Sequence, residues 1–518
     1  MNTNKKTIIA IIGAGPAGLS AAYNLLKTNK NIKPILIEQE SVVGGLSRTI
    51  SVNQSGTDIG PHRFFTKNDD VWKLWTDILP LQNAPAADDI LLNRNIDVTA
   101  TGANPEQTDK VFLKRRRFSR IYYQKCFFDY PIKIQSVFKL GLKTTIAIGF
   151  SYLKSCFIKL KEDSLEAFMI NRFGKKLYQL FFEDYTEKVW GVHPSKLSSQ
   201  WGAQRIKGIS LFRVLGNIIS STFHINKKKE ISLIDEYYYP KLGSSQMWET
   251  IAQKITELGG EILLNHQTIA FIKENEKITS VTIRNIHTQE DKTLDCDMVI
   301  SSMPIKELLT EMSNVPQDIY NIANNLQYRD FILVNYVLKN INLKNNTDFP
   351  TVNNVAPDSW IYLQDKNIKA GRLDIANNFS PYIIRDFKKE IVINLEYFCN
   401  ETDEFWQKDD TDILNFATNE LKKLHAADEK DIIFANVTRV KKAYPSYTGS
   451  YENFDKIKEY INSIPNLYCI GRNGQHKYNN MDHSVLDGIE IAKIINNNGD
   501  KTTLWDLNTE NEYQEVKK

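Results

Sequence analysis

The stretch Ile8–Gly18 reads IIAIIGAGPAG, an apolar run that leads into the pattern G-x-G-x-x-G. A second apolar run, Pro34–Ile37, ends at the acidic residue Glu38. A buried strand, a glycine-rich turn, a helix and a second strand that closes on an acid are typical of a βαβ unit that binds a dinucleotide. The sequence therefore predicts an α/β fold built around a nucleotide cofactor.

Each position of this unit has a physical role. Gly13 permits a tight turn, Gly15 lets the backbone approach a pyrophosphate, and Gly18 allows the helix to pack closely on the strand. The helix N-terminus presents free N–H groups to the anion, and the carboxylate of Glu38 can accept hydrogen bonds from ribose hydroxyls. An ordinary glycine-rich turn is the alternative, but the flanking strands and the acid favour the cofactor site.

A second glycine pair, Gly44 and Gly45, follows the acid and leads to Arg48. This combination resembles the FAD-binding flavoproteins of the amine oxidase and glutathione reductase type. The resemblance implies a Rossmann-type, glutathione reductase-like FAD domain in which Gly45 and Arg48 contact the cofactor, rather than a domain that holds NAD alone.

The composition is that of an ordinary globular protein. The chain has 518 residues, 42% hydrophobic and 25% charged, with a formal net charge of +3. The basic runs Lys114–Arg117 and Lys227–Lys229 are best interpreted as solvated surface, so no nucleic-acid partner is predicted. Five widely spaced cysteines form no C-x-x-C motif, which predicts a reducing, cytoplasmic location and no metal site.

Membrane segments are not predicted. Residues 1–6 are polar and run directly into the first strand, which leaves no room for a signal peptide. The apolar stretch Phe138–Leu160 is interrupted by lysines and fails as a membrane span. An amphipathic helix lying on a membrane surface stays open for this stretch.

The FAD-binding domain is expected to be discontinuous. We predict that residues 1–80, 240–305 and 465–500 form it, because short β-rich runs in the middle piece end in an apolar strand before Pro304.

The remaining residues divide into three further segments. Residues 110–235 predict a mainly helical inserted domain, since apolar residues recur at spacings of three and four. Residues 306–464 show the alternation of strands and predict an antiparallel sheet that covers the substrate. Residues 501–518 are interpreted as a polar tail.

Four further motifs keep the order of one flavoprotein family. The motifs are Gly60–Thr66 (GPHRFFT), Gly174–Trp190 (GKKLYQLFFEDYTEKVW), Pro194–Arg205 and Gly471–Ser484. They resemble, in turn, the flavin-side loop, the helical-domain segment, the mobile-loop segment and the closing element of the UDP-galactopyranose mutases. In that family reduced FAD is a nucleophile: its N5 attacks the anomeric carbon, the nucleoside diphosphate leaves, and the sugar ring recloses at a different size.

The resemblance implies three catalytic residues. Arg205 and Arg372 would hold the leaving diphosphate, because guanidinium groups stay charged and make paired hydrogen bonds. His62 would lie against the flavin, the alternative being a histidine that only bonds its own turn. Either arginine could instead be an ordinary surface residue.

The same resemblance implies further contacts to cofactor and substrate. The additional cofactor-side residues are Gly60, Gly471, Arg472 and Asp482. The substrate-side candidates, aromatic or polar, are Trp190, Tyr328, Arg329, Tyr447, Tyr478 and Asn480. Tyr444 belongs with these aromatic candidates, and any of the tyrosines could instead be a core residue.

Two functions of different type follow. The first is a flavin-dependent, ring-contracting isomerase of a nucleotide-diphosphate sugar that feeds a surface polysaccharide, with NAD(P)H as a transient reductant. The second is an FAD-dependent oxidoreductase of the amine oxidase or protoporphyrinogen oxidase type. Trp190 and the two arginines favour the mutase, because a porphyrinogen or an amine needs no diphosphate clamp. The sequence departs from the mutases at Arg63, which either binds another anion or faces solvent, and it leaves the oligomeric state open.

Overall fold

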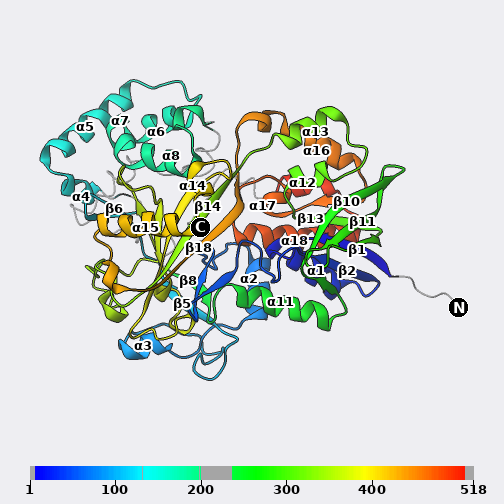
Figure 1. The fold of residues 1–518 in the computed structure, drawn as a ribbon, viewed down its shortest axis with the longest axis horizontal. Helices are drawn as coiled ribbons and strands as arrows, with labels where there is room; N and C mark the ends of the chain where they lie inside the picture. The colour runs from blue at the N-terminus through cyan, green and yellow to red at the C-terminus, as the bar shows by residue number, and fades with distance from the viewer. Residues whose placement is uncertain (1–5, 131, 133, 198, 200–235, 508–518) are drawn as a thin grey trace, which may run out of the picture.

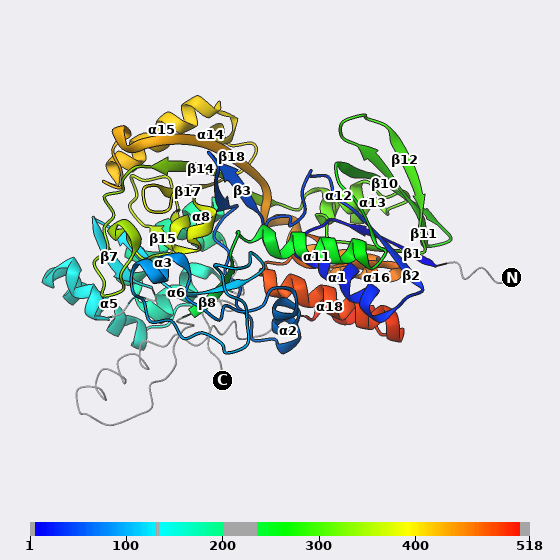
Figure 2. The same ribbon diagram turned by 90° about the horizontal axis from the view of Figure 1, so that it is seen from below.

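The computed structural model describes residues 6–507 except 131, 133, 198 and 200–235. Figure 1 shows a parallel sheet with its helices on the right, a larger sheet on the left, and a group of helices above that larger sheet. Figure 2 gives the same arrangement from below. Segments from the two ends of the chain, one blue and one red, meet in the body that contains the parallel sheet.

The parallel sheet has five strands in the order β19-β13-β1-β2-β9. All four neighbouring pairs are parallel. The strands are β1 (Thr7–Ile12), β2 (Ile32–Ile37), β9 (Glu261–Leu263), β13 (Met298–Ser301) and β19 (Leu467–Cys469). Strands that are far apart in the sequence therefore share one sheet, and their carboxyl ends meet at one edge.

Helices cover both faces of this sheet. Helix α1 (Pro16–Thr28) has Pro16 at its first position, where the missing N–H costs no hydrogen bond. It lies beside α18 (Met481–Asn497), and a Cβ at Gly488 would stand 2.5 Å from the Cβ of Ser20. The other helices that contribute to the two cores flanking this sheet are α2 (Asp69–Ile78), α11 (Ser245–Glu257), α12 (Ile305–Thr310), α13 (Gln317–Asn324) and α16 (Phe454–Ser463). A three-stranded sheet of β10 (His266–Glu274), β11 (Lys277–Asn285) and β12 (Asp291–Asp295) packs against the second of these cores.

The larger sheet has seven strands in the order β18-β14-β17-β16-β15-β6-β7. Its strands are β6 (Ser119–Tyr123), β7 (Cys126–Asp129), β14 (Tyr328–Leu338), β15 (Trp360–Leu363), β16 (Arg372–Ile375), β17 (Ile391–Cys399) and β18 (Ile432–Pro445). The central strands β14 and β17 are buried on both faces, because α14 (Glu404–Gln407) and α15 (Asp410–Lys423) cover one face and other segments cover the second. All pairs are antiparallel except β15 with β6, which is parallel.

The segment predicted to be helical begins with strands. Beyond β6 and β7, β5 (Phe112–Arg116) pairs with β8 (Glu236–Pro240), so residues 112–129 are not helical. Ser119–Tyr123 reads SRIYY, and its β-branched and aromatic residues suit a pleated strand between partners. The helices follow as α4 (Ile134–Val137), α5 (Leu142–Phe157), α6 (Leu165–Phe173), α7 (Lys175–Tyr178), a π-helix (Gln179–Glu183) and α8 (Asp184–Trp190). Their shared core includes Phe168, Leu177 and Trp190.

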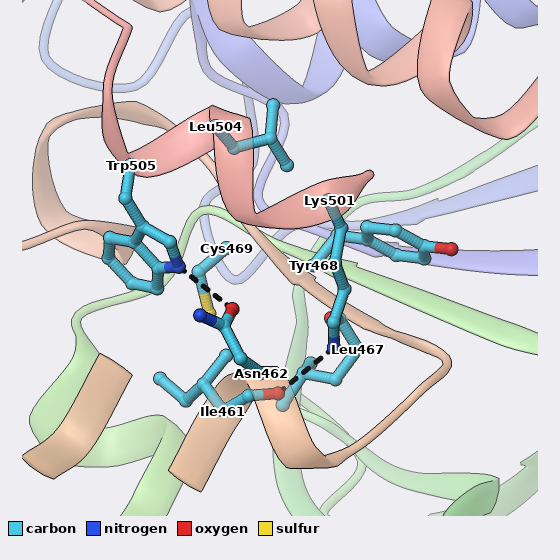
Figure 3. A pocket seen from close by; sticks show the side chains of 8 residues that line it. All are labelled: Ile461, Asn462, Leu467, Tyr468, Cys469, Lys501, Leu504 and Trp505. Carbon is cyan, nitrogen blue, oxygen red and sulfur yellow. Dashed lines mark hydrogen bonds between the residues drawn. The ribbon is translucent and has the colours of Figure 1, made fainter. Parts of the chain in front are cut away.

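The first residues of the expected polar tail pack against the protein. Figure 3 shows Lys501 and Trp505 of a short 3-10 helix (Lys501–Trp505) beside the end of α16. The Lys501 ammonium donates to the Ile461 and Leu467 carbonyls at 3.1 and 3.2 Å, and the Trp505 indole donates to Asn462 at 3.0 Å. The pocket between them encloses about 10 Å³, enough for about one water and too little for a substrate.

Candidate active site

The glycine-rich turn after β1 forms a cradle with no room for side chains. Gly13 has φ +97°, and a Cβ there would stand 2.3 Å from the Ser302 hydroxyl. A Cβ on Gly18 would stand 2.0 Å from the Gly13 carbonyl oxygen, so only glycine lets α1 approach the strand this closely. The second glycine pair lies against the first: Gly44 donates to the Ala14 carbonyl at 2.9 Å. Because these glycines have no side chains, the backbone N–H groups at the N-terminus of α1 stay accessible to an anion.

Glu38 stands at the end of β2 beside this turn. Its carboxylate accepts hydrogen bonds from the Ala14 and Glu40 N–H groups at 2.8 and 3.0 Å. Burial raises the pKa of Glu38, and these two backbone donors oppose the rise. Arg48 follows the second glycine pair and forms an ion pair with Glu40 at 3.2 Å. The acid and the arginine that the sequence predicts at the cofactor thus lie on either side of Glu40.

The loop that carries Gly60 and His62 contains unpaired buried atoms. Gly60 has φ +76°, and a Cβ there would meet nothing within 4 Å. His62 Nδ1 lies 3.5 Å from Asp58 Oδ2, and neither atom has a hydrogen-bond partner among the described residues. Open space beside Gly60 and orphaned polar atoms nearby fit a missing polar group at this loop.

The closing element brings the end of the chain to the first helix. Gly471 has φ +74°, its N–H donates to the Asp487 carboxylate at 2.8 Å, and a Cβ on it would stand 2.9 Å from the Cβ of Ala17. Burial raises the pKa of Asp487 to about 7. Asp482 lies in the first turn of α18. Together with the cradle and the Gly60 loop, these residues fit a dinucleotide cofactor that is held at the carboxyl edge of the parallel sheet.

Arg472 packs against two aromatic side chains and fixes their position. Its guanidinium donates to the Asn479 carbonyl at 3.0 and 2.7 Å and to the Ala443 carbonyl at 2.9 Å. It also lies over the rings of Tyr444 and Tyr478, at 5.4 and 4.9 Å from their centroids. These two rings are stacked on each other at 5.6 Å. Arg472 therefore connects the closing element to the larger sheet.

Arg372 lies at the centre of this aromatic group. It stands on β16 directly opposite Glu396 of β17, and two of its guanidinium nitrogens donate to that carboxylate. One of them also donates to the Tyr444 hydroxyl at 2.8 Å. Burial alone would lower the pKa of Arg372, but the Glu396 carboxylate raises it above its ordinary value. In the described part of the chain Nη1 has no hydrogen-bond partner, so it is available to an anion.

Two further tyrosines complete the group. Tyr362 of β15 is the register partner of Arg372, and Tyr185 of α8 packs edge-on against Tyr362 at 5.4 Å. Burial raises the pKa of both tyrosines, and the positive charge of Arg372 opposes this rise. The two phenols therefore stay neutral hydrogen-bond donors near neutral pH.

Glu396, Tyr185 and Tyr362 are site residues that the sequence did not predict. An acid inside the apolar strand Ile391–Cys399 was the available signal, because a buried carboxylate requires a charged partner. The two tyrosines gave no signal of their own, since the residues that bring them to Arg372 lie on other strands and helices.

Several predicted substrate residues have other roles in this structure. Tyr328 and Arg329 are adjacent on β14 and point to opposite faces of the sheet. Tyr328 packs edge-on against His476 at 4.8 Å, in the core beside the parallel sheet and not with Arg372. Arg329 donates to the Val189 carbonyl at 3.0 Å and to Asn400 at 2.8 Å, so its charge binds the C-terminal end of α8. In this structure both side chains thus support the elements around the site, and their contact with substrate stays a prediction.

The other predicted residues support the site or lie outside the description. Trp190 is buried at the end of α8, and Tyr447 accepts a hydrogen bond from the Tyr478 N–H. Asn480 is the N-cap of α18. Arg205 lies outside the described residues.

Arg63 is partly buried and packs against an aromatic ring. Its guanidinium stacks over Trp360 at 3.4 Å from the ring centroid and donates to the Ser119 hydroxyl at 2.7 Å. The stacking joins the His62 loop to β15 and β6, and thereby to the strand that carries Tyr362.

One group of side chains among the described residues has the spacing of metal ligands. The ligand atoms of Glu166, Glu183 and His193 lie within 4.8 Å of one another. The Nδ1 atom of His193 accepts the Ser195 N–H at 3.3 Å, and Nε2 lies 3.5 Å from Glu183. With Nδ1 accepting, the ring proton lies on Nε2 and faces the Glu183 carboxylate.

Comparison with known proteins places the chain in a family. The model of the flavin containing amine oxidoreductases matches residues 16–496. A probable UDP-galactopyranose mutase of Klebsiella pneumoniae is 25% identical over 203 residues, 38% of this chain and 43% of that protein. A dTDP-fucopyranose mutase of Escherichia coli is 25% identical over 195 residues, 36% of this chain and 43% of that protein. The aligned part thus spans less than half the length of these curated relatives.

Solved structures are similar over nearly the whole chain. A reduced UDP-galactopyranose mutase superimposes with a TM-score of 0.76 at 19% identity, over 97% of this chain and 99% of that one. A putative protoporphyrinogen oxidase from Exiguobacterium gives a TM-score of 0.66 at 13% identity, over 95% and 99%. These likenesses show the fold, a mixed α/β architecture that mutases and oxidases share. The chain belongs to the flavin containing amine oxidoreductases and is a flavoprotein that resembles the UDP-galactopyranose mutases within that superfamily.

Proposed function

We propose that this protein is a flavin-dependent mutase that isomerises the sugar ring of a nucleotide-diphosphate sugar. The observation that carries the proposal is the position of Arg372, held by Glu396 among Tyr185, Tyr362 and Tyr444. A fixed guanidinium with a spare N–H edge, surrounded by neutral phenols, suits a diphosphate. An amine or a porphyrinogen substrate requires no such group.

The cofactor of the proposal is FAD, bound in the glutathione reductase-like manner. The turn of Gly13, Gly15 and Gly18 would hold its pyrophosphate, Glu38 a ribose, and the Gly60 loop and Gly471 would border its flavin end. Bound and reduced, the flavin would supply the nucleophile for the sugar. We also propose that the chain divides into an FAD-binding domain, an inserted helical region and a sheet that covers the substrate.

The residues of the chain would act on the leaving group. Arg372 would bind diphosphate oxygens through Nη1 while Glu396 fixes the plane of its guanidinium. Tyr185 and Tyr362 would donate hydrogen bonds without adding negative charge, because burial raises the pKa of each. Arg205 would supply a second guanidinium from the segment after Pro194. These groups become most effective as charge develops on the departing phosphate.

The relatives support a nucleotide sugar and leave its identity open. One curated relative is a UDP-galactopyranose mutase and the other a dTDP-fucopyranose mutase, so both nucleotides belong in the test. The supporting role in surface polysaccharide synthesis, the cytoplasmic location and NAD(P)H as reductant belong to the proposal as well. The free state of all five cysteines supports a reducing compartment.

The decisive experiment is a turnover assay with reduced protein under nitrogen. The flavin is reduced with dithionite, and the protein is incubated with UDP- and dTDP-linked hexoses and deoxyhexoses. A product of unchanged mass, formed only with reduced flavin and without consuming reductant at each turnover, is the expected result. Hydrogen peroxide formed in proportion to an oxidised substrate, with no isomer from any nucleotide sugar, would overturn the mutase in favour of an oxidase.

A further inference from the structure

Helix α5 packs against the protein through its polar residues. Ser155 is buried, and the hydroxyl of Ser151 accepts a hydrogen bond from the Lys176 N–H at 2.9 Å. The helix also lies very close to the turn at Gly174, where a Cβ would stand 2.8 Å from the Tyr152 backbone. Small and hydroxyl-bearing residues thus hold the helix in place, and Ile148 is its one buried large apolar side chain.

The outward face of α5 and its flanking turns is apolar. Eight of the eighteen exposed large hydrophobic residues in the described part of the chain lie between positions 138 and 160. Phe157 is 86% exposed, Leu142 71% and Phe150 70%. The eight residues, most of them three or four positions apart and so on one face of the helix, are Phe138, Leu142, Ile146, Phe150, Leu153, Phe157, Ile158 and Leu160. A contiguous apolar stripe of this kind is uncommon on a free surface and marks an interaction site.

Lysines supply all the charge within residues 138–161, and the acids Glu162 and Asp163 follow directly. Residues 138–161 contain five lysines and no aspartate or glutamate. All five lysines, which are Lys139, Lys143, Lys154, Lys159 and Lys161, are exposed. An apolar face bordered mainly by cations is the pattern of a helix that lies in the interface of an anionic bilayer.

We propose that the apolar stripe of α5 docks on the surface of a membrane that contains anionic lipids. Figures 1 and 2 both place α5 at the outer edge of the molecule, where a flat surface can reach it. The stripe would enter the boundary between headgroups and acyl chains while the lysines contact lipid phosphates. The helix lies on the bilayer and does not cross it, since no described helix is long and apolar enough to span one.

Charge distinguishes this partner from a second copy of the chain. A symmetric dimer through the stripe would bring two sets of five lysines together, and residues 138–161 offer no acid to neutralise them. Anionic lipid headgroups supply the missing negative charge. The proposal concerns a surface outside the candidate active site, so it stands or falls apart from the mutase activity.

Vesicle flotation of the full, flavin-loaded chain tests the proposal. Vesicles of phosphatidylcholine alone are compared with vesicles that also contain phosphatidylglycerol. We expect binding to the anionic vesicles, reduced at least about tenfold in the Phe150→Glu/Phe157→Glu variant, because the charges would have to enter the apolar layer. Replacing Lys143, Lys154 and Lys161 by Gln should also weaken this binding at least about tenfold.

A matched control and two contrary outcomes complete the test. Ile90→Glu makes the same change at a 56% exposed apolar residue of α3 (Ala87–Leu91) and should leave vesicle binding unchanged. Unchanged binding in the Phe150→Glu/Phe157→Glu variant, or no binding of the native chain to either vesicle, would overturn the proposal. A lipid-free dimer that this double variant converts to monomer, without vesicle binding by the native chain, would assign the stripe to a second copy. Equal melting temperatures of the variants and the native chain verify the fold.

Discussion

Arg372 and Glu396 face each other on adjacent antiparallel strands, and the carboxylate accepts two hydrogen bonds from the guanidinium. Glu396 is 0% exposed, so its charge depends on this partner. The pair fixes the plane of the guanidinium, whose Nη2 also donates to the Tyr444 hydroxyl. The buried acid Glu396 thus orients Arg372, the cation that we propose binds the substrate.

Arg372→Ala should abolish turnover on the nucleotide sugar, by at least about 100-fold, because the departing diphosphate loses its fixed donor. The protein should stay yellow, since Arg372 lies outside the glycine cradle. The single variant also orphans Glu396, which should cost about 3–5 kcal/mol of unfolding free energy. Arg372→Ala/Glu396→Gln should regain most of that stability and none of the turnover. Arg284→Ala, at a surface ion pair with Asp291, is the control and should turn over normally; a double variant with native kinetics would refute the assignment.

Gly18→Ala should lower the flavin content of the purified protein. The new Cβ would collide with the Gly13 carbonyl oxygen, so either α1 moves or the turn opens, at a cost of about 1–3 kcal/mol. The ratio of flavin to protein absorbance measures the effect. Gly149→Ala adds the same methyl group to α5, where nothing lies within 4 Å, and should retain its flavin and gain up to about 1 kcal/mol of stability. Full flavin occupancy in Gly18→Ala would show that the cradle tolerates a side chain.

Stability should fall on acidification below pH 6.5, in part because of His476. Its Nε2–H donates to the Ser446 carbonyl at 2.9 Å, and burial lowers the pKa of His476 to about 4. Between pH 4 and the ordinary pKa of about 6.5 the unfolded chain binds the extra proton and the folded chain does not, so stability rises with pH. The histidine should contribute a loss of about 3 kcal/mol between pH 6.5 and 4.

Denaturant unfolding as a function of pH measures this contribution. His476→Asn keeps a side-chain donor and tolerates the positive φ of +46°, so it is the suitable comparison. The slope of unfolding free energy against pH should be shallower in this variant over the same interval. Identical slopes would mean that other groups cause the acid sensitivity.

Arg329→Met should destabilise the protein without removing substrate recognition. The variant leaves the carbonyl of Val189 and the side chain of Asn400 without their charged donor, at a cost of about 2–3 kcal/mol. The melting temperature should fall while the flavin absorbance stays. The opposite pattern, a native melting temperature with lost affinity for the nucleotide sugar, would restore Arg329 as a substrate ligand.

Whether a feature could be predicted from the sequence depends on how far apart in the chain its contacting residues lie. The turn of Gly13 and Gly18 was predictable, because its glycine spacing is local and Gly18 packs against Gly13, five residues before it. The β-branched and aromatic residues of Ser119–Tyr123 also favour a strand, but the three-and-four spacing later in that segment outweighed them. Residues 112–129 could be assigned to strands only with the knowledge that β15 and β8 pair with them.

The sequence by itself determined the nucleotide-binding unit, the flavoprotein resemblance and the apolar stripe of α5, because local spacing encodes strands, turns and helix faces. Only the tertiary structure decided that Arg372 pairs with Glu396, that Tyr185 and Tyr362 join them, and that the stripe faces outward. Sheet register brings Arg372 to an acid 24 positions away, and packing brings Arg329 to a carbonyl 140 positions away. Such contacts form between elements whose separation along the chain carries no periodic signal, so their partners become known only when the fold closes.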